Sequence, residues 1–278
     1  MSIRLFLLDF SAIIQYLYMV KKIPGLISLQ SDITSGLPLP QGKSLNIINK
    51  IRAIPSVAAA GVIIGKIDNR VVAKAVSQGA DIIEVRLDTF DDLSPVKIEK
   101  ALKHLREITS VPILLTLRSR REGGTTEIPD KERLNIITEA IRYADIVDIE
   151  LGARRVLKNV IDLAHETGKL AIVSYHNFKA TPGTKELIDI ISKARSAGAD
   201  FVKIAAFANK KEDIKKLAGL LTDSNDLIMI AMGPIGVASR VFFPILGSRI
   251  TYGSVTGKTA PGQISLKEIK KEFRRYGI

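Results

Sequence analysis

Short apolar runs alternate with amphipathic segments along the chain from residue 56 to the C-terminus. In the segments between the runs, apolar residues recur with the i, i+3, i+4, i+7 spacing of a helix face, as in 187–194 and 214–221. This alternation predicts a parallel sheet, because right-handed crossovers through helices join parallel strands. The eight runs predicted to be strands are residues 56–64, 81–87, 112–117, 145–151, 170–175, 200–206, 227–232 and 249–255.

The repeat also predicts the fold class. Eight strand–helix units within about 220 residues are what a (β/α)8 TIM barrel, an α/β fold, requires. An open doubly wound sheet is the alternative, but no G-x-G-x-x-G sequence follows the first strand. We therefore expect residues 56–278 to form one (β/α)8 barrel. Within it, Ser265 and Glu268 predict a capping box for the last helix, and Thr181–Pro182 predicts the start of an earlier one.

Residues 1–55 precede this pattern and differ from it. An apolar run at 5–20 is interrupted by Asp9 and Gln15, and its sixteen residues are fewer than the roughly 20 that a membrane-spanning helix needs. A secretory signal is not expected, since no clear small-residue cleavage site follows the run. We interpret 1–55 as an N-terminal extension and linker, in which the run either packs on the domain as a helix or precedes a true start at Met19.

Composition narrows the chemistry and the partners. The 278-residue chain has no cysteine and three histidines, which excludes disulfides, thiolate zinc sites and a His-rich metal centre. Its net charge of +12 suits an anionic partner, but the sequence contains no nucleic-acid-binding module. We therefore expect a small-molecule substrate rather than nucleic acid, and a cytoplasmic protein without membrane association. The sequence leaves a homodimer open.

Charged residues lie inside strands that should be apolar. A parallel strand with both faces buried is normally apolar, yet Glu84 and Arg86 share one face of the second strand. Asp148 and Glu150 share one face of the fourth, and Lys203 lies in the middle of the sixth. Burying an unpaired charge costs several kcal/mol, so each needs a partner or a function. The two acid-bearing strands can form a mutual ion lattice, and for the fourth strand a structural and a functional role are equally open.

Lys203 and His176 suggest covalent catalysis. The active site of a barrel lies at the C-terminal ends of its strands, where His176 follows the fifth strand. Desolvation favours a neutral amine, and a neutral lysine attacks a carbonyl carbon to form a Schiff base. Adjacent strands lie about 4.8 Å apart, so His176 can face a substrate held on Lys203. The pair predicts proton transfer at the carbon next to a carbonyl.

The last two loops predict an anion-binding end of the site. Arg240 lies at the head of the helix after the seventh strand, and a glycine-containing loop from Gly257 to Gln263 follows the eighth. Loops in these positions bind phosphate in many barrels. A guanidinium beside a hydroxyl and an amide suits a carboxylate equally well.

Six motifs occur in order over about four-fifths of the chain, from residue 56 onward. Together they resemble the type I 3-dehydroquinate dehydratase family, whereas any single motif would be weak evidence. The motifs are E-V-R-L-D at 84–88, L-R-S-R-R-E-G-G at 117–124, S-Y-H-N-F-K-A-T-P at 174–182, A-D-F-V-K-I-A at 199–205, M-G-P-I-G-V-A-S-R at 232–240 and A-P-G-Q-I-S at 260–265.

The resemblance implies a hydro-lyase that converts 3-dehydroquinate to 3-dehydroshikimate in the shikimate pathway, without a metal or a cofactor. It implies that Lys203 forms the Schiff base, that His176 acts as acid and base, and that Glu122 orients His176. Thr259 stands where serine is common in the family, which preserves the hydroxyl. The implied substrate-binding residues are Glu84, Arg86 and Arg118 at the ring hydroxyls, and Arg240, Thr259 and Gln263 at the carboxylate.

Two alternatives predict different behaviour. A class I aldolase is also a Schiff-base barrel, but it would cleave a carbon–carbon bond and prefer phosphorylated substrates. A basic barrel without enzymatic activity would bind nucleic acid or act as a scaffold, with purely structural ion pairs. That second alternative gives no reason for Lys203 inside an apolar strand, and we favour the dehydratase.

Overall fold

In the computed structural model, residues 58–222 and 224–278 are described, and within them eight parallel strands form a single sheet. The strands are β1 (Ala58–Ile64), β2 (Ile82–Arg86), β3 (Ile113–Thr116), β4 (Ile146–Glu150), β5 (Leu170–Asn177), β6 (Phe201–Phe207), β7 (Leu227–Met232) and β8 (Ile250–Ser254). Neighbours pair in the order β7-β6-β5-β4-β3-β2-β1-β8. The backbone N of Arg249, just before β8, donates to the carbonyl of Leu227 at 2.9 Å, so β7 and β8 meet and nearly close the barrel.

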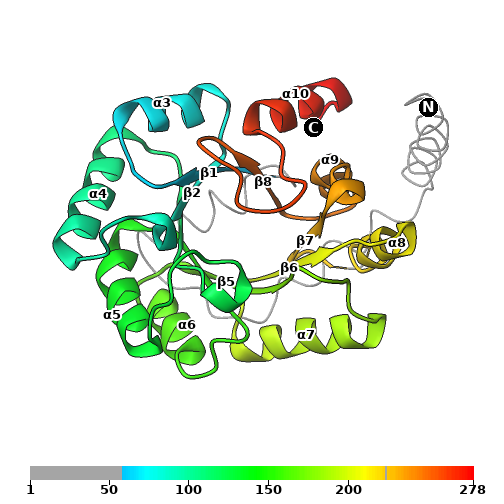
Figure 1. The fold of residues 1–278 in the computed structure, drawn as a ribbon, viewed down its shortest axis with the longest axis horizontal. Helices are drawn as coiled ribbons and strands as arrows, with labels where there is room; N and C mark the ends of the chain where they lie inside the picture. The colour runs from blue at the N-terminus through cyan, green and yellow to red at the C-terminus, as the bar shows by residue number, and fades with distance from the viewer. Residues whose placement is uncertain (1–57, 223) are drawn as a thin grey trace, which may run out of the picture. The chain divides into compact units, whose positions relative to one another are not determined.

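The helices surround this ring of strands (Figure 1). They are α3 (Asn69–Ser77), α4 (Pro95–Ile108), α5 (Asp130–Ala140), α6 (Leu157–Glu166), α7 (Thr184–Ala197), α8 (Lys211–Gly219), α9 (Ser239–Ile245) and α10 (Leu266–Tyr276). Short 3-10 turns, η1 (Leu87–Thr89), η2 (Arg120–Glu122), η3 (Ile141–Tyr143) and η4 (Pro234–Gly236), lie in the connections. Each of the eight predicted runs overlaps a strand, so the predicted (β/α)8 TIM barrel is confirmed and the open doubly wound sheet is wrong.

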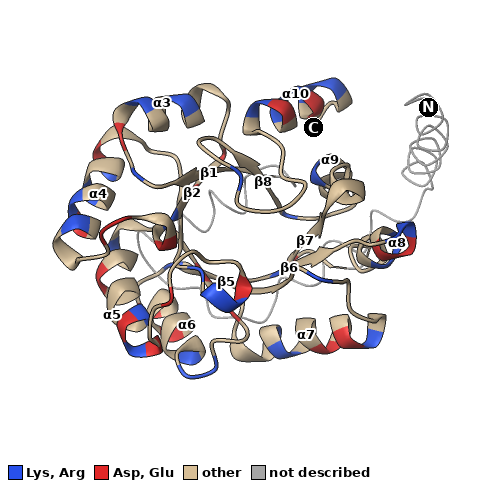
Figure 2. Cartoon of the chain, in the orientation of Figure 1, with Lys and Arg blue, Asp and Glu red and all other residues tan. Residues whose placement is uncertain are grey.

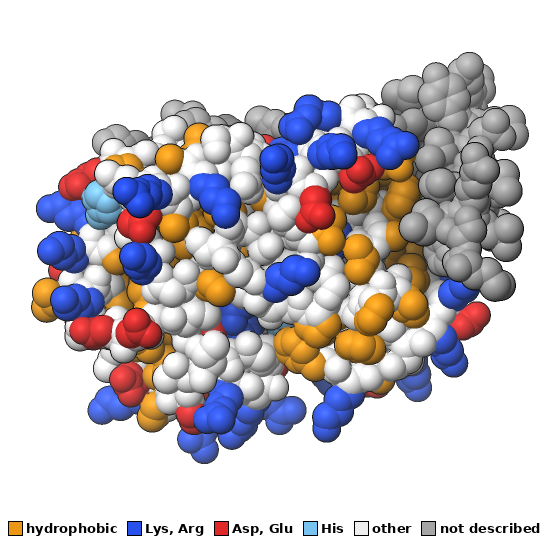
Figure 3. All heavy atoms as spheres, turned by 45° about the horizontal axis from the view of Figure 1, so that its top comes forward, with side chains coloured by type: hydrophobic (Ala, Val, Ile, Leu, Met, Phe, Trp, Pro, Cys, Tyr) orange, Lys and Arg blue, Asp and Glu red, His pale blue; other side chains and the backbone are white. Residues whose placement is uncertain are grey.

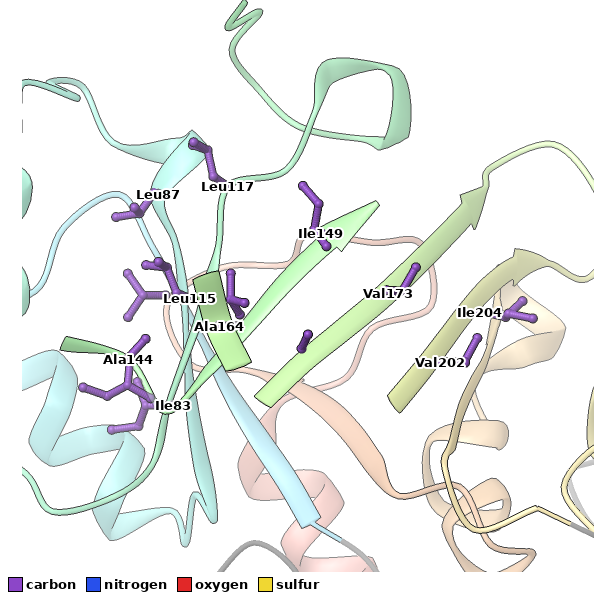
Figure 4. Packing of buried hydrophobic residues seen from close by; sticks show 14 of the residues in the cluster. Ile83, Leu87, Leu115, Leu117, Ala144, Ile149, Ala164, Val173, Val202 and Ile204 are labelled. Atoms are coloured by element: carbon purple, nitrogen blue, oxygen red, sulfur yellow. The ribbon is translucent and has the colours of Figure 1, made fainter. Parts of the chain in front are cut away.

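Side chains alternate between the two faces of the barrel wall. The outward positions pack against the helices, and Figure 4 shows part of this layer, including Leu115, Val173 and Ile204. The first inward positions close the barrel floor with apolar groups, as Ile82, Leu114 and Ile228 do. On β2 to β6 the next inward positions, nearer the C-terminal strand ends, are polar: Glu84, Thr116, Asp148, Ser174 and Lys203. The strand period of two therefore builds an apolar floor below a polar mouth.

One of the two predicted helix starts is correct. At α10 the Ser265 hydroxyl accepts from the backbone N of Glu268 at 3.2 Å, and the Glu268 carboxylate accepts from the backbone N of Ser265 at 2.8 Å, which confirms the capping box. The start at Thr181–Pro182 is wrong, because α7 begins at Thr184 with Gly183 as N-cap. The Thr181 hydroxyl donates instead to the carbonyl of Phe207 at 2.9 Å, so it ties this loop to β6.

The predictions for residues 1–55, including a true start at Met19, lie outside the described residues. Among the helices of the described part, none combines the length and the apolar character that crossing a membrane requires. Acidic and basic positions alternate around the outer helices, and charged positions also lie inside the ring (Figure 2). On the face seen in Figure 3, basic side chains are spread among acidic and uncharged ones rather than gathered in a single patch.

Candidate active site

A cavity lies among the C-terminal halves of the strands and the loops that follow them. It brings together side chains from the second, third, fifth and sixth strands and from the last two loops, which are far apart in the sequence. Each residue that the sequence predicted for the site lines it: Lys203, His176, Glu122, Glu84, Arg86, Arg118, Arg240, Thr259 and Gln263. The side chains of Phe178 and Tyr252 complete part of the wall.

Lys203 projects from β6 into this cavity and is 5% exposed. Its Nζ donates to Asp148 Oδ2 at 3.1 Å, lies 4.0 Å from Glu84 Oε1, and sits 4.2 Å from the centre of the Tyr252 ring. Along β6 the neighbours of Lys203 are apolar, so its charged partners come entirely from β4 and β2 across the barrel. The amine is thus held in a fixed position between two carboxylates and an aromatic face.

Arg118 connects the carboxylates of β4. It donates to Asp148 Oδ1 at 2.8 Å and to the Ser174 hydroxyl at 2.7 Å, and it lies 3.2 Å from Glu150 Oε1. Burial alone would raise the pKa of Asp148, but Arg118 and Lys203 outweigh burial and hold that pKa well below its usual range. From α5, Arg133 donates to the other Glu150 oxygen at 2.5 Å. Glu150 therefore belongs to an ion lattice, whereas Asp148 belongs both to the lattice and to the surroundings of Lys203.

Arg86 does not join that lattice, so the mutual pairing of the second and fourth strands that the sequence left open does not include it. Arg86 donates through Nε and Nη2 to the two carboxylate oxygens of Asp88, both at 2.8 Å. The turn η1 after β2 folds Asp88 back onto Arg86, two positions earlier in the chain. Asp88 also accepts from the backbone N of Arg118 at 3.2 Å and of Thr125 at 3.3 Å. The pair therefore holds both ends of the loop that carries Glu122.

The same loop needs its two glycines to turn back toward the cavity. Gly123 has a φ of +88°, a left-handed conformation that favours glycine. A Cβ on Gly124 would lie 2.1 Å from the carbonyl oxygen of Arg118. Because only glycine fits both positions, the sequence E-G-G places Glu122 against β5.

Glu122 and His176 form a dyad at the end of β5. Glu122 Oε2 accepts from the backbone N of His176 at 2.8 Å and lies 3.0 Å from its Nδ1. Burial raises the pKa of Glu122 to about 7, and although Arg118 opposes this, the Glu150 carboxylate adds to it. Burial, together with the charges of Arg118 and Lys203, lowers the pKa of His176 well below its usual value. The imidazole is therefore neutral at neutral pH and can accept a proton.

On the side of the cavity formed by the last two loops, Arg240 has hydrogen-bond donors that no described residue accepts. Arg240 is 2% exposed, and its Nη1 donates to the carbonyl of Tyr252 at 3.5 Å. Its Nε and Nη2 find no partner among the described residues. Burial lowers the pKa of Arg240 to about 10, so the guanidinium is still charged at neutral pH. Nearby, Gln263 Oε1 accepts from the backbone N of Thr259 at 2.7 Å, which leaves the Gln263 amide NH₂ as its donor. A buried cation beside an amide suits an anionic group.

Sequence reasoning missed several contributors. Ser174 and Tyr252 share the inward parity of their strands, so strict alternation could have placed both in the barrel. Asp88 follows Arg86 at the spacing of one strand face, but it lies beyond the strand end. Phe178 stacks on the His176 ring at a centroid distance of 6.4 Å. Arg133 gave no local signal, because its helix position becomes significant only when α5 packs beside β4.

The chain is similar to proteins of one known family. The model of the family described as type I 3-dehydroquinase matches residues 66–277. A 3-dehydroquinate dehydratase from Methanothrix thermoacetophila is 38% identical over 212 residues, covering 75% of this chain and 87% of the relative. The crystal structure of the Aquifex aeolicus 3-dehydroquinate dehydratase is 32% identical, with a TM-score of 0.72 and coverage of 79% and 98%. The Clostridium difficile type I enzyme, solved with covalently modified comenic acid, is 29% identical, with a TM-score of 0.73 and coverage of 79% and 91%.

Proposed function

The chain belongs to the type I 3-dehydroquinase family, and from this membership we propose that Lys203 and His176 remove water from 3-dehydroquinate through a Schiff base. The activity itself is that of a 3-dehydroquinate dehydratase, a hydro-lyase, which confirms the family resemblance seen in the sequence. The class I aldolase and the non-enzymatic barrel are excluded by the same family match. We place the reaction in the shikimate pathway, with 3-dehydroshikimate as product.

One observation carries the covalent step: the Lys203 amine and the His176 imidazole line the same buried cavity. Lys203 gives up one proton as its amine adds to the ketone carbon, and that proton is returned as the ketone oxygen leaves as water, which gives a protonated imine. That cation lies next to the carbon to be deprotonated, so it stabilises the electron pair that the carbon–hydrogen bond leaves behind. Asp148, 3.1 Å from Nζ, supports the positive charge of the imine.

His176 moves the protons. Glu122 orients its ring through Nδ1, which leaves Nε2 as the basic nitrogen. Nε2 takes the proton from the carbon next to the imine, and the resulting enamine expels the tertiary hydroxyl, which leaves as water with that proton. Hydrolysis of the imine consumes one water and restores Lys203, so the net change is the loss of one water. General acid–base catalysis of this kind contributes about 10²–10⁴-fold.

The remaining predicted residues orient the six-membered ring of the substrate. Arg240, with its two unpartnered donor atoms, fits the carboxylate, and Thr259 and Gln263 lie on the same wall. On the other side we assign Glu84 to a ring hydroxyl, as its Oε1 accepts only from Thr116 among the hydrogen bonds of the described residues. Arg86 and Arg118 also line the cavity, but acidic partners hold both guanidinium groups. Besides contacting the ring hydroxyls, the two arginines therefore keep this side of the cavity rigid through their bonds to Asp88 and Asp148.

Borohydride trapping tests the Schiff base. The protein is incubated with 3-dehydroquinate and sodium borohydride, and its peptides are analysed by mass spectrometry. The expected result is substrate-derived mass on the peptide that contains Lys203, also in a His176→Ala variant that no longer turns over substrate. Lys193→Ala, which changes an exposed lysine paired with Asp189, should trap like the wild type. An unmodified chain, or label on another lysine, would disprove the proposal.

A further inference from the structure

Tyr252 carries a buried hydroxyl that no described group satisfies. In the described part of the chain, the buried side-chain atoms without a hydrogen-bond partner are Gln78 Oε1, Arg133 Nε, Arg240 Nε, Arg240 Nη2 and the Tyr252 hydroxyl. Three of these five atoms belong to two residues that line the catalytic cavity. All three can donate a hydrogen bond, so the cavity presents more donors than its own walls accept.

The position of Tyr252 makes this hydroxyl part of the reaction site. Tyr252 lies on β8 at an inward position, is 3% exposed, and its ring lies 4.2 Å from the Nζ of Lys203. Its carbonyl accepts from Arg240 at 3.5 Å. A six-membered ring bonded to Nζ would therefore lie alongside the phenol, between the amine and the guanidinium.

The hydroxyl is a donor rather than a base. Burial, with the Glu84 and Asp148 carboxylates, raises the pKa of Tyr252 well above its usual value, although Arg118 and Arg240 oppose this. A phenol that stays protonated offers one hydrogen to an acceptor oxygen. No described protein group accepts from the Tyr252 hydroxyl, and a phenylalanine would fill the same space without a polar atom. The presence of tyrosine here calls for an acceptor that arrives with the ligand.

We propose that Tyr252 is a further catalytic residue, whose buried hydroxyl donates a hydrogen bond to an oxygen of the substrate held at Lys203. The proposal rests on the Schiff base of the proposed function for the location of the substrate. It adds a donor that none of the residues assigned above supplies. A hydroxylated carboxylate substrate is rich in acceptor oxygens, so it can accept hydrogen bonds from the unpartnered donor atoms of Arg240 and Tyr252.

Tyr252→Phe removes this one oxygen and keeps the ring beside Lys203. We expect kcat/KM to fall about tenfold or more, as for the loss of one buried hydrogen bond to the substrate. We also expect little change in Tm, because no described protein group is bonded to the hydroxyl. The matched control is Tyr143→Phe, which removes a hydroxyl that donates to Glu99 on the outer surface and should leave kcat/KM unchanged.

The outcomes separate the two proposals. A wild-type kcat/KM in Tyr252→Phe would overturn the hydroxyl's role. Borohydride trapping in parallel reports on Lys203 alone. Trapping of the wild type together with normal kinetics in Tyr252→Phe rejects only the new assignment. No trapping at Lys203 in the wild type rejects the covalent mechanism and removes the basis for placing the substrate beside Tyr252.

Discussion

Asp148 lies 3.1 Å from the Nζ of Lys203 through one carboxylate oxygen, and through the other it accepts from Arg118 and Ser174. A single buried carboxylate thus positions the amine and anchors the ion lattice of the barrel interior. Since its positive neighbours hold its pKa far below neutral pH, Asp148 is charged wherever the enzyme works. Asp148 therefore contributes both to the stability of the folded barrel and to the position of the Lys203 amine.

Asp148→Asn should destabilise the protein strongly. The variant leaves Arg118 and Lys203 with less compensating charge inside the barrel, and breaking such a buried pair costs about 3–5 kcal/mol in the free energy of unfolding. Because the folded pKa of Asp148 is depressed below 3.8, its contribution is fully present above that pH and is lost as the pH falls through the folded value. Urea unfolding at neutral and acidic pH measures both effects.

The control for this experiment is Asp162→Asn. Asp162 pairs with Lys158 on the exposed face of α6, so its loss should change the unfolding free energy by less than about 0.5 kcal/mol. Equal stabilities for Asp148→Asn and the wild type would show that the lattice does not depend on this carboxylate.

The Glu122–His176 dyad should control the pH dependence of the reaction. With the pKa of Glu122 at about 7, the carboxylate is protonated below neutral pH and then cannot accept from Nδ1. We expect kcat/KM to rise with pH and level off above about 7. Glu122→Gln should lower kcat/KM by roughly 10–100-fold and remove this acidic limb. Initial rates between pH 5 and pH 9 (about the range accessible to a stable barrel) test this.

The matched variant is Glu132→Gln, at an exposed position on α5, which should keep both the rate and the profile of the wild type. If Glu122→Gln kept the same acidic limb, the titrating group would lie elsewhere and the role of Glu122 in orienting His176 would need another basis.

Arg240→Lys should weaken substrate binding more than it slows the chemistry. A lysine keeps the charge but cannot present two parallel donors to a carboxylate. We expect KM to rise by about tenfold or more, with a much smaller change in kcat, because the carboxylate is held equally before and during the reaction. Among the described residues Arg240 loses only the long bond from Nη1 to the Tyr252 carbonyl, so the Tm should change little. A larger loss in kcat than in KM would assign Arg240 to the reacting atoms instead.

The sequence by itself determined the barrel fold and which charged residues lie at the C-terminal ends of its strands. Alternation of strands and helices predicted the fold, because each element must bury its own apolar face. The period of two placed Glu84 and Arg86 on one face, and Lys203 stood out because an isolated lysine is costly in an apolar strand. These inferences needed only neighbours along the chain.

Only the tertiary structure decided which of these charges meet. Asp148 reaches Lys203 from a strand 55 residues earlier, and Arg133 reaches Glu150 from an outer helix. The unpartnered hydroxyl of Tyr252 is likewise invisible in the sequence, because whether a buried group is satisfied depends on everything packed around it. Local patterns fix the direction of each side chain, whereas distances across the barrel depend on the register and tilt of all the strands together.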